Sequence, residues 1–166
     1  VWPKLEQALR QAISNLVAMR ETEGSNIYGD FIKRADLIAE KLAVIEERSP
    51  QVVEEYQIRL SDRINELLAK HNQVIEPERL LQEVAIFADR TSITEEIVRL
   101  KSHIKQFRLI IDADQPVGRK LDFLIQEFNR EANTIASKAN DYTLAQVVVE
   151  IKAEIEKIRE QIQNIE

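Results

Sequence analysis

An imidazole, a guanidinium and a carboxylate occur at helical spacing within residues 93–111. Glu96, Arg99 and His103 are three and four positions apart, which places them on one flank of a helix. A histidine beside a carboxylate and a guanidinium can act as a general acid or base near neutral pH. The same cluster is also typical of an ion-pair network at a surface or interface. The spacing therefore indicates a candidate catalytic group and leaves the structural alternative open.

The opposite flank of the same segment is basic. Lys101, Lys105 and Arg108 follow one another there, a set suited to phosphate contacts, which supply affinity without sequence preference. The whole chain has a formal net charge of −6, which argues against a uniformly basic nucleic-acid-binding protein. Between residues 99 and 120, however, six basic residues outnumber two acidic ones. An anionic ligand is therefore expected near this segment.

Residues 118–139 predict a second helix with polar groups on two sides of its apolar stripe. Glu127 and Glu131 lie on one side, and Asp122 lies among amide side chains on the other. Carboxylates in such zones can hold a divalent metal ion through oxygen ligands, as phosphodiester chemistry often requires. The alternative is an amide-rich interface between helices or subunits.

Two features of this second helix conflict with an ordinary solvent-exposed face. The stretch NREANTIAS at 129–137 contains residues that helix interiors disfavour, and such conflicts are expected where function or an interface overrides propensity. Phe123 points away from the apolar stripe, which predicts a second buried surface on this helix.

The composition indicates an all-α protein. Hydrophobic residues make up 44% and charged residues 31% of the 166 residues, with three glycines and four prolines. Without cysteine, disulfides and thiolate metal sites are excluded. Because glycine-rich nucleotide-binding, zinc-protease and serine-hydrolase motifs are absent, we expect no nucleotide cofactor. No run resembles a membrane span or signal peptide. We therefore expect a cytoplasmic protein without a membrane partner, and the opening on Val1 predicts a start further upstream.

Apolar periodicity predicts about six helices, several of them long. The patterns over 5–45 join into one helix flexed at Gly24, whereas Ser49 before Pro50 predicts the start of a new helix. Further helices are expected at 77–90, 92–111, 118–139 and from about residue 143 to the end. The last helix carries its apolar residues in a heptad pattern, which requires a partner helix from this chain or from another copy.

The expected architecture is thus an all-α long-helix bundle with a heptad-patterned C-terminal helix. Within it, residues 1–75 are predicted to form a long antiparallel hairpin arm, and residues 76–166 are predicted to form a C-terminal helical domain.

Three runs of the sequence resemble one known family. They are QEVAIFADRTSITEEIVRLKSHIKQF at 82–107, PVGRKLDFLIQEFNREANTIASKAND at 116–141 and EIEKIREQIQNIE at 154–166, with MRETEG at 19–24 as a shorter signature upstream. In this order they are similar to the C-terminal half of the YicC/YloC family of bacterial proteins. The resemblance covers nearly the whole chain and implies a further N-terminal domain that this chain lacks.

The resemblance implies an endoribonuclease that cleaves RNA phosphodiester bonds as a ring-shaped oligomer, reported as a hexamer. His103, assisted by Glu96 and Arg99, would handle a proton or the developing charge, and Glu127, Glu131 and Asp122 would position the reacting groups or a divalent ion. The candidate ligands of a divalent ion, Mg²⁺ or Mn²⁺, are Glu83, Asp89 and Asp122. The candidate RNA-binding residues are Arg90, Lys101, Lys105, Arg108, Arg119, Lys120, Arg130 and Lys138.

Two other functions stay open at this point. The same polar zones would also suit an RNA-binding or protein-binding adaptor that delivers RNA to another ribonuclease. A purely structural oligomerisation domain built on the heptad helix is the third alternative.

Overall fold

Helices account for almost all of the chain that the structure describes. The computed structural model describes residues 2–71, 76–113 and 116–165, and no strand occurs in these ranges. The helices are α1 (Trp2–Ala69), α2 (Pro77–Thr91), α3 (Thr94–Ile111), α4 (Gly118–Lys138) and α5 (Tyr142–Ile162). The predicted all-α class is confirmed. The predicted number of about six helices was wrong, because the described residues form five.

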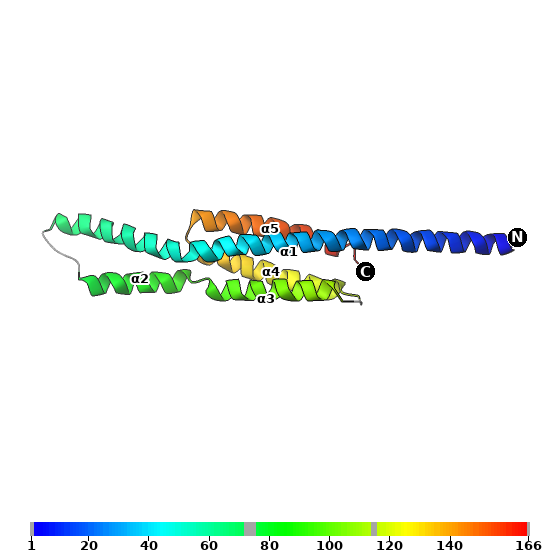
Figure 1. Ribbon diagram of the computed structural model, residues 1–166. Coiled ribbons are helices and arrows are strands. Elements are labelled where there is room, and N and C mark those ends of the chain that lie inside the picture. The colour runs from blue at the N-terminus through cyan, green and yellow to red at the C-terminus, as the bar shows by residue number, and fades with distance from the viewer. Residues whose placement is uncertain (1, 72–75, 114–115, 166) are drawn as a thin grey trace.

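The molecule is a long rod whose whole length is spanned by α1 (Figure 1). The middle of α1 packs with α3, α4 and α5 as a four-helix bundle, and the C-terminal part of α1 packs against α2. The helices α3 and α4 run antiparallel to each other, as do α4 and α5. Short connections between sequential helices favour this arrangement.

One apolar core fills the bundle, with buried side chains from α1, α3, α4 and α5. On α1 the buried residues include Phe31, Ala35, Ile38, Leu42 and Ile45, at alternating intervals of four and three. On α5 they include Val148, Ile151, Ile155, Ile158 and Ile162. Each large apolar side chain gains roughly 1.5–3 kcal/mol on full burial. The apolar face of α5 is therefore covered by helices of the same chain, α1 and α4.

The predicted helix start at Ser49 and Pro50 was wrong, because α1 continues through Pro50. Proline lacks a backbone N–H and crowds the preceding turn, so it disfavours a helix interior. Here Ile45 and Val52, on either side of Pro50, are both buried in the core. Packing of these side chains holds the helix continuous where local propensity alone predicts a break.

As a result, residues 2–69 form one helix in place of two helices of a hairpin. The antiparallel neighbour of its C-terminal part is α2 (Figure 1), where the rings of Tyr56 and Phe87 stack with centroids 3.6 Å apart. The predicted domain boundary between 75 and 76 falls at the edge of the described residues and stays a prediction.

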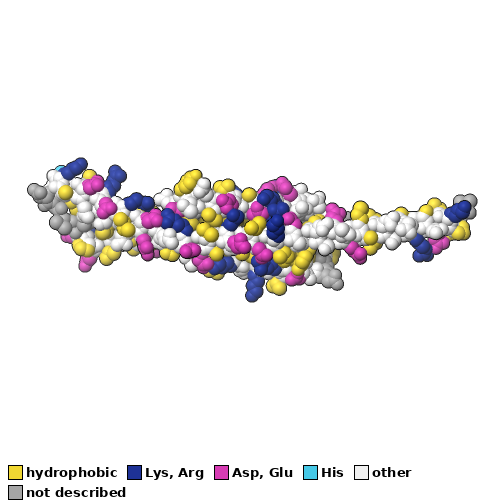
Figure 2. Space-filling model, turned by 45° about the horizontal axis from the view of Figure 1, so that its top comes forward, with side chains coloured by type: hydrophobic (Ala, Val, Ile, Leu, Met, Phe, Trp, Pro, Cys, Tyr) yellow, Lys and Arg dark blue, Asp and Glu magenta, His cyan; other side chains and the backbone are white. Residues whose placement is uncertain are grey.

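The N-terminal part of α1 projects beyond the bundle as a single helix (Figures 1 and 2). Every residue from 2 to 26 is exposed, and this projecting arm carries large apolar side chains along its length. They are Trp2, Leu5, Leu9, Ile13, Leu16, Val17 and Met19. No helix in the described ranges combines the length and apolarity needed to cross a membrane.

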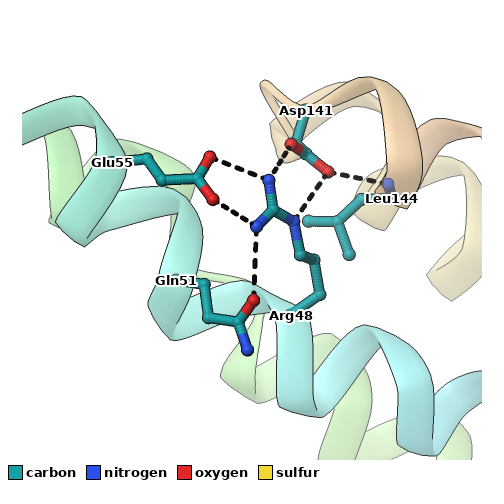
Figure 3. A network of polar contacts seen from close by, with 5 residues as sticks. All are labelled: Arg48, Gln51, Glu55, Asp141 and Leu144. Carbon is teal, nitrogen blue, oxygen red and sulfur yellow. Dashed lines mark hydrogen bonds and ion pairs between the residues drawn. The ribbon is translucent and has the colours of Figure 1, made fainter. Parts of the chain in front are cut away.

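A polar clamp joins α1 to the start of α5 next to Pro50 (Figure 3). The Arg48 guanidinium donates to Asp141 Oδ2 at 2.8 Å and to both oxygens of Glu55, with Nη2 2.9 Å from Oε2. Asp141 is also the N-cap of α5 and accepts a hydrogen bond from the Leu144 amide at 2.9 Å. The clamp therefore ties the two sides of the proline to a neighbouring helix.

Hydrogen bonding from Arg48 holds the pKa of Asp141 below its usual range, although partial burial alone would raise that pKa. Because the folded-state pKa lies below the unfolded one, the clamp stabilises the protein above the ordinary pKa of aspartate, and this stability is lost as the pH falls through the folded-state pKa. We expect Asp141→Ala to lower the free energy of unfolding by about 1 kcal/mol at neutral pH through loss of the cap alone. Urea denaturation from neutral to acidic pH measures it.

The control is Asp141→Asn, which keeps the capping oxygen and removes only the charge. It should be less stable than wild type at neutral pH, and the difference should disappear in acid. A difference that persists after the carboxylate is protonated would contradict the role of the ion pair.

Candidate functional site

The seam between α3 and α4 carries a row of ionisable side chains. Helix α3 contributes Glu96, Arg99 and His103, which share one flank because they are three and four positions apart. Helix α4 runs antiparallel beside it and contributes three residues, Glu127, Glu131 and Lys138. These six residues are called the α3–α4 seam below. The five residues predicted as catalytic all lie in it, although nothing in the geometry alone assigns them a chemical role.

At one end of the seam, His103, Glu127 and Glu131 converge. One ligand atom of each lies within 4.8 Å of the others. Glu131 is buried and the other two are half-buried. In the part of the chain that the structure describes, His103 Nδ1 is buried without a hydrogen-bond partner. The imidazole lies over Phe128, with ring centroids 6.4 Å apart. This arrangement can hold a divalent cation or bring an imidazole to a group bound by the carboxylates.

Glu131 is a buried carboxylate, and Arg99 is its cationic neighbour in the described chain. Its side chain is 3% exposed, and the Arg99 Nη1 atom lies 3.9 Å from Oε1, beyond hydrogen-bond distance. Arg99 also pairs with Glu95 one turn earlier and stays about half exposed. Since a buried charge is costly unless it is paired or coordinates a cation, this end of the seam favours a further positive charge.

Glu96 lies at the other end of the seam and binds Lys138. Lys138 Nζ donates to Glu96 Oε1 at 2.7 Å. Burial would raise the pKa of Glu96, but the hydrogen bond from Lys138 and the charge of Arg99 help to hold it below the usual value. The sequence predicted that Glu96 assists His103. No hydrogen bond or ion pair joins these two side chains among the described residues, so Glu96 contacts Lys138 instead.

The predicted basic flank of α3 faces a different helix. Lys101 pairs with Glu46 at 2.5 Å and Arg108 with Asp36 at 2.6 Å, so both are engaged by acidic residues of α1. Lys105 lies on the same flank and is exposed. This flank lies on the side of α3 away from the seam, so it and the seam do not form one continuous site. The predicted phosphate contacts of Lys101 and Arg108 would first have to displace these ion pairs.

The other predicted RNA-binding residues are distributed over two helices. Arg90 is exposed near the end of α2. Arg119 and Lys120 are exposed in the first turn of α4. Arg130 is exposed farther along α4 and pairs with Glu127 at 3.4 Å. Of these residues, Arg130 contacts the seam through Glu127, whereas Arg119 and Lys120 lie about two helical turns before Glu127 on α4.

None of the three candidate metal ligands predicted from the sequence belongs to the convergent group. Glu83 and Asp89 are exposed on α2. Asp122 is exposed on α4 and accepts a hydrogen bond from Gln126 at 3.1 Å. The only group of possible ligands in the described ranges is His103 with Glu127 and Glu131. The spacing of Glu127 and Glu131 in the sequence already placed both carboxylates on one flank of α4. That spacing did not show that this flank would lie against His103 of α3.

The poor helix formers of NREANTIAS have separate local explanations. Thr134 Oγ1 donates to the Arg130 carbonyl at 3.0 Å, and Ser137 Oγ donates to the Thr134 carbonyl at 2.9 Å. Such bonds to the preceding turn are the usual way for these side chains to sit within a helix. Asn133 accepts a hydrogen bond from Lys152 of α5 at 2.8 Å. Part of this stretch therefore serves contacts within the chain.

Comparison with known proteins adds an independent observation to this geometry. Residues 45–166 match the family model described as "Endoribonuclease YicC-like, C-terminal". The chain belongs to this family. The YicC-like match includes every residue of the α3–α4 seam, and the resemblance noted from the sequence is confirmed.

Two curated YicC-like relatives are named "Probable endoribonuclease YicC". The protein of Clostridioides difficile (strain 630) is 52% identical over 166 residues, covering 100% of this chain and 56% of the relative. The protein of Haemophilus influenzae (strain ATCC 51907 / DSM 11121 / KW20 / Rd) is 37% identical over 159 residues, covering 96% of this chain and 54% of the relative. The chain therefore spans about half the length of the curated relatives it matches.

Proposed function

We propose that this chain carries the reaction centre of an endoribonuclease at the α3–α4 seam. The observation that carries the proposal is the approach of His103, Glu127 and Glu131 to within 4.8 Å of one another. A partly exposed Arg99 lies beside them. The names of the two curated relatives support RNA as the substrate.

Cleavage of an RNA phosphodiester bond requires two proton transfers. The attacking oxygen, from water or the ribose 2′-hydroxyl, loses a proton as it bonds to phosphorus. The leaving oxygen gains one as its bond to phosphorus breaks. His103 carries one of these protons, because an imidazole is the side chain best suited to accept and donate near neutral pH. Its ring lies at 26° to the ring of Phe128, with centroids 6.4 Å apart.

The cationic residues of the seam bind the phosphates. Arg99 donates hydrogen bonds to the phosphate at the reaction centre and offsets the negative charge that develops on its oxygens. Lys138 is partly exposed and binds a neighbouring phosphate, while Glu96 positions its ammonium group. Glu96 is thus a positioning residue in this proposal.

Glu127 and Glu131 fit a divalent cation such as Mg²⁺ or Mn²⁺, which prefer carboxylate oxygens. Such an ion, when bound, supplies charge stabilisation to a phosphoryl oxygen. The fit rests on the donor set and on the buried Glu131 carboxylate, which a cation would compensate.

The test combines cleavage with a separate measurement of metal binding. Labelled single-stranded RNA is incubated with the protein in Mn²⁺ or in EDTA, and Mn²⁺ binding is measured by titration calorimetry. We expect cleavage in Mn²⁺ only, and loss of both Mn²⁺ binding and cleavage in the double variant Glu127→Gln, Glu131→Gln. Glu160→Gln, an exposed carboxylate of α5, is the matched control and should retain both.

Three results would contradict the proposal or parts of it. Undiminished cleavage by the double variant would show that the reaction centre does not lie at the seam. Undiminished cleavage in EDTA would show that the reaction does not need a metal ion. RNA binding without cleavage in every preparation would favour the adaptor that delivers RNA to another ribonuclease.

The second candidate function is self-association, as in a ring-shaped hexamer. The observation that favours it is the row of exposed apolar side chains on the projecting arm, from Trp2 to Met19. Exposed apolar surface of this kind marks sites where another protein segment packs. If the protein neither binds nor cleaves RNA, a structural oligomerisation domain becomes the better explanation.

A further inference from the structure

Phe123 is an aromatic side chain in an unexpected place. Its exposed fraction is 65%, whereas Phe128, five residues later on the same helix, is fully buried. Among the described residues of α4, Phe123 is the only large hydrophobic side chain that is exposed. The bundle core therefore does not explain its presence.

The neighbours of Phe123 along α4 are the residues that the proposed function places at the substrate. Residues four apart on a helix have Cβ atoms about 6 Å apart. Arg119 precedes Phe123 by four positions, and Glu127 follows it by four. The ring therefore lies one helical turn from the Glu127 carboxylate of the candidate reaction centre.

Two exposed cations, Arg119 and Lys120, lie near Phe123 on α4, together with the exposed carboxylate of Asp122. The ion pairs found in the described part of the chain engage neither Arg119 nor Lys120. This contrasts with Lys101 and Arg108, whose charges are matched by acidic residues of α1. An exposed aromatic ring beside cations that can hold the phosphate backbone is an arrangement that binds single-stranded nucleic acid.

We propose that Phe123 is a stacking platform for one unpaired base of the RNA strand. Arg119 and Lys120 hold the phosphates on one side of that base, and the phosphate on the other side lies at the α3–α4 seam. Stacking on an aromatic ring requires an unpaired, splayed base. The site thereby selects single-stranded RNA over a duplex. This inference rests on the proposed function, because it assumes that RNA occupies the seam.

A protein partner fits Phe123 less well than a base does. Protein interfaces have a contiguous apolar centre surrounded by polar groups. Beside Phe123 on the exposed side of α4 lie Arg119, Gln126 and Arg130, all polar. A single aromatic ring among polar and cationic groups suits a nucleotide better. The flat base stacks on the ring, and the negatively charged phosphates on either side of the base meet the cations.

The experiment measures equilibrium binding of a 5′-fluorescein-labelled single-stranded oligoribonucleotide by anisotropy, with EDTA present to prevent cleavage. A duplex of the same length is measured in parallel. We expect Phe123→Ala and Phe123→Leu to weaken single-strand binding by about tenfold, as loss of one base stack does. Phe123→Tyr should retain wild-type affinity. Binding of the duplex should not change in any variant.

The matched control is Val149→Ala, which truncates a similarly exposed apolar side chain on α5 and should bind as wild type does. Tryptophan fluorescence gives a direct readout of stacking. Because Trp2 is the only tryptophan of the sequence, the double variant Trp2→Phe, Phe123→Trp has its single fluorophore at the proposed platform. Its fluorescence should be quenched by single-stranded RNA and not by the duplex.

Retention of affinity by Phe123→Leu would overturn the inference, because it would show that an apolar contact suffices without a ring. Unchanged affinity of Phe123→Ala would also overturn it while leaving the proposed function intact. A change in oligomer mass of Phe123→Ala with unchanged RNA affinity would assign the ring to a contact between copies. Absence of any RNA binding by the wild-type protein would contradict both the proposed function and this inference.

Discussion

Replacing His103 with alanine is expected to slow RNA cleavage at least about 100-fold, the usual contribution of a general acid or base. The reason is positional. His103 has a ligand atom within 4.8 Å of the carboxylates of Glu127 and Glu131, and its Nδ1 atom has no hydrogen-bond partner in the described chain. The measurement is the single-turnover rate of cleavage of labelled RNA as a function of pH. The variant should lose one limb of the pH profile in addition to its rate.

The chain offers a matched control in its other histidine. His71 is exposed beyond the C-terminal end of α1, and His71→Ala should cleave as wild type does. Circular dichroism and Mn²⁺ calorimetry of His103→Ala separate the roles of the residue. Wild-type metal binding with a lost rate supports proton transfer, whereas lost metal binding would make His103 a ligand. A wild-type rate for His103→Ala would exclude the residue from the chemistry.

The helices around this site could largely be predicted because their apolar residues repeat at helical intervals. The predicted segments at 92–111 and 118–139 correspond closely to α3 and α4. The failure at Pro50 has a physical cause. Proline carries a strong local signal for a helix start. The burial of Ile45 and Val52 against other helices favours a continuous helix instead. Apolar periodicity does not show which helices will bury these two side chains.

The sequence predicted which site residues share a flank of the same helix, but not which helices would pack together to form the site. Spacing placed Glu96, Arg99 and His103 on one flank of their helix. It could not specify that this flank would pack against α4, so the convergence of His103 with Glu127 and Glu131 was not predicted as a ligand group. Pairing between helices depends on which apolar stripes bury one another, and several pairings satisfy the same stripes.

Replacing Phe107 with alanine is expected to lower the free energy of unfolding by about 3–5 kcal/mol, the range for truncating a buried aromatic side chain. Phe107 is fully buried. Its ring meets Phe31 of α1 edge to face at 5.4 Å and Phe128 of α4 at 5.9 Å. The side chain therefore joins three helices of the bundle, and the cavity left by its removal has walls on α1, α3 and α4 that cannot all move inward. Urea denaturation followed by circular dichroism measures the change.

The control is Phe123→Ala, which removes the same side chain from an exposed position and should leave the unfolding midpoint nearly unchanged. The comparison also tests how the core supports the site, because the ring of Phe128 pairs with that of Phe107 at 5.9 Å and with that of His103 at 6.4 Å between centroids. If Phe107→Ala were as stable as Phe123→Ala, the packing of α3 between α1 and α4 would be wrong. The α3–α4 seam would then lose the scaffold that brings His103 to the two carboxylates.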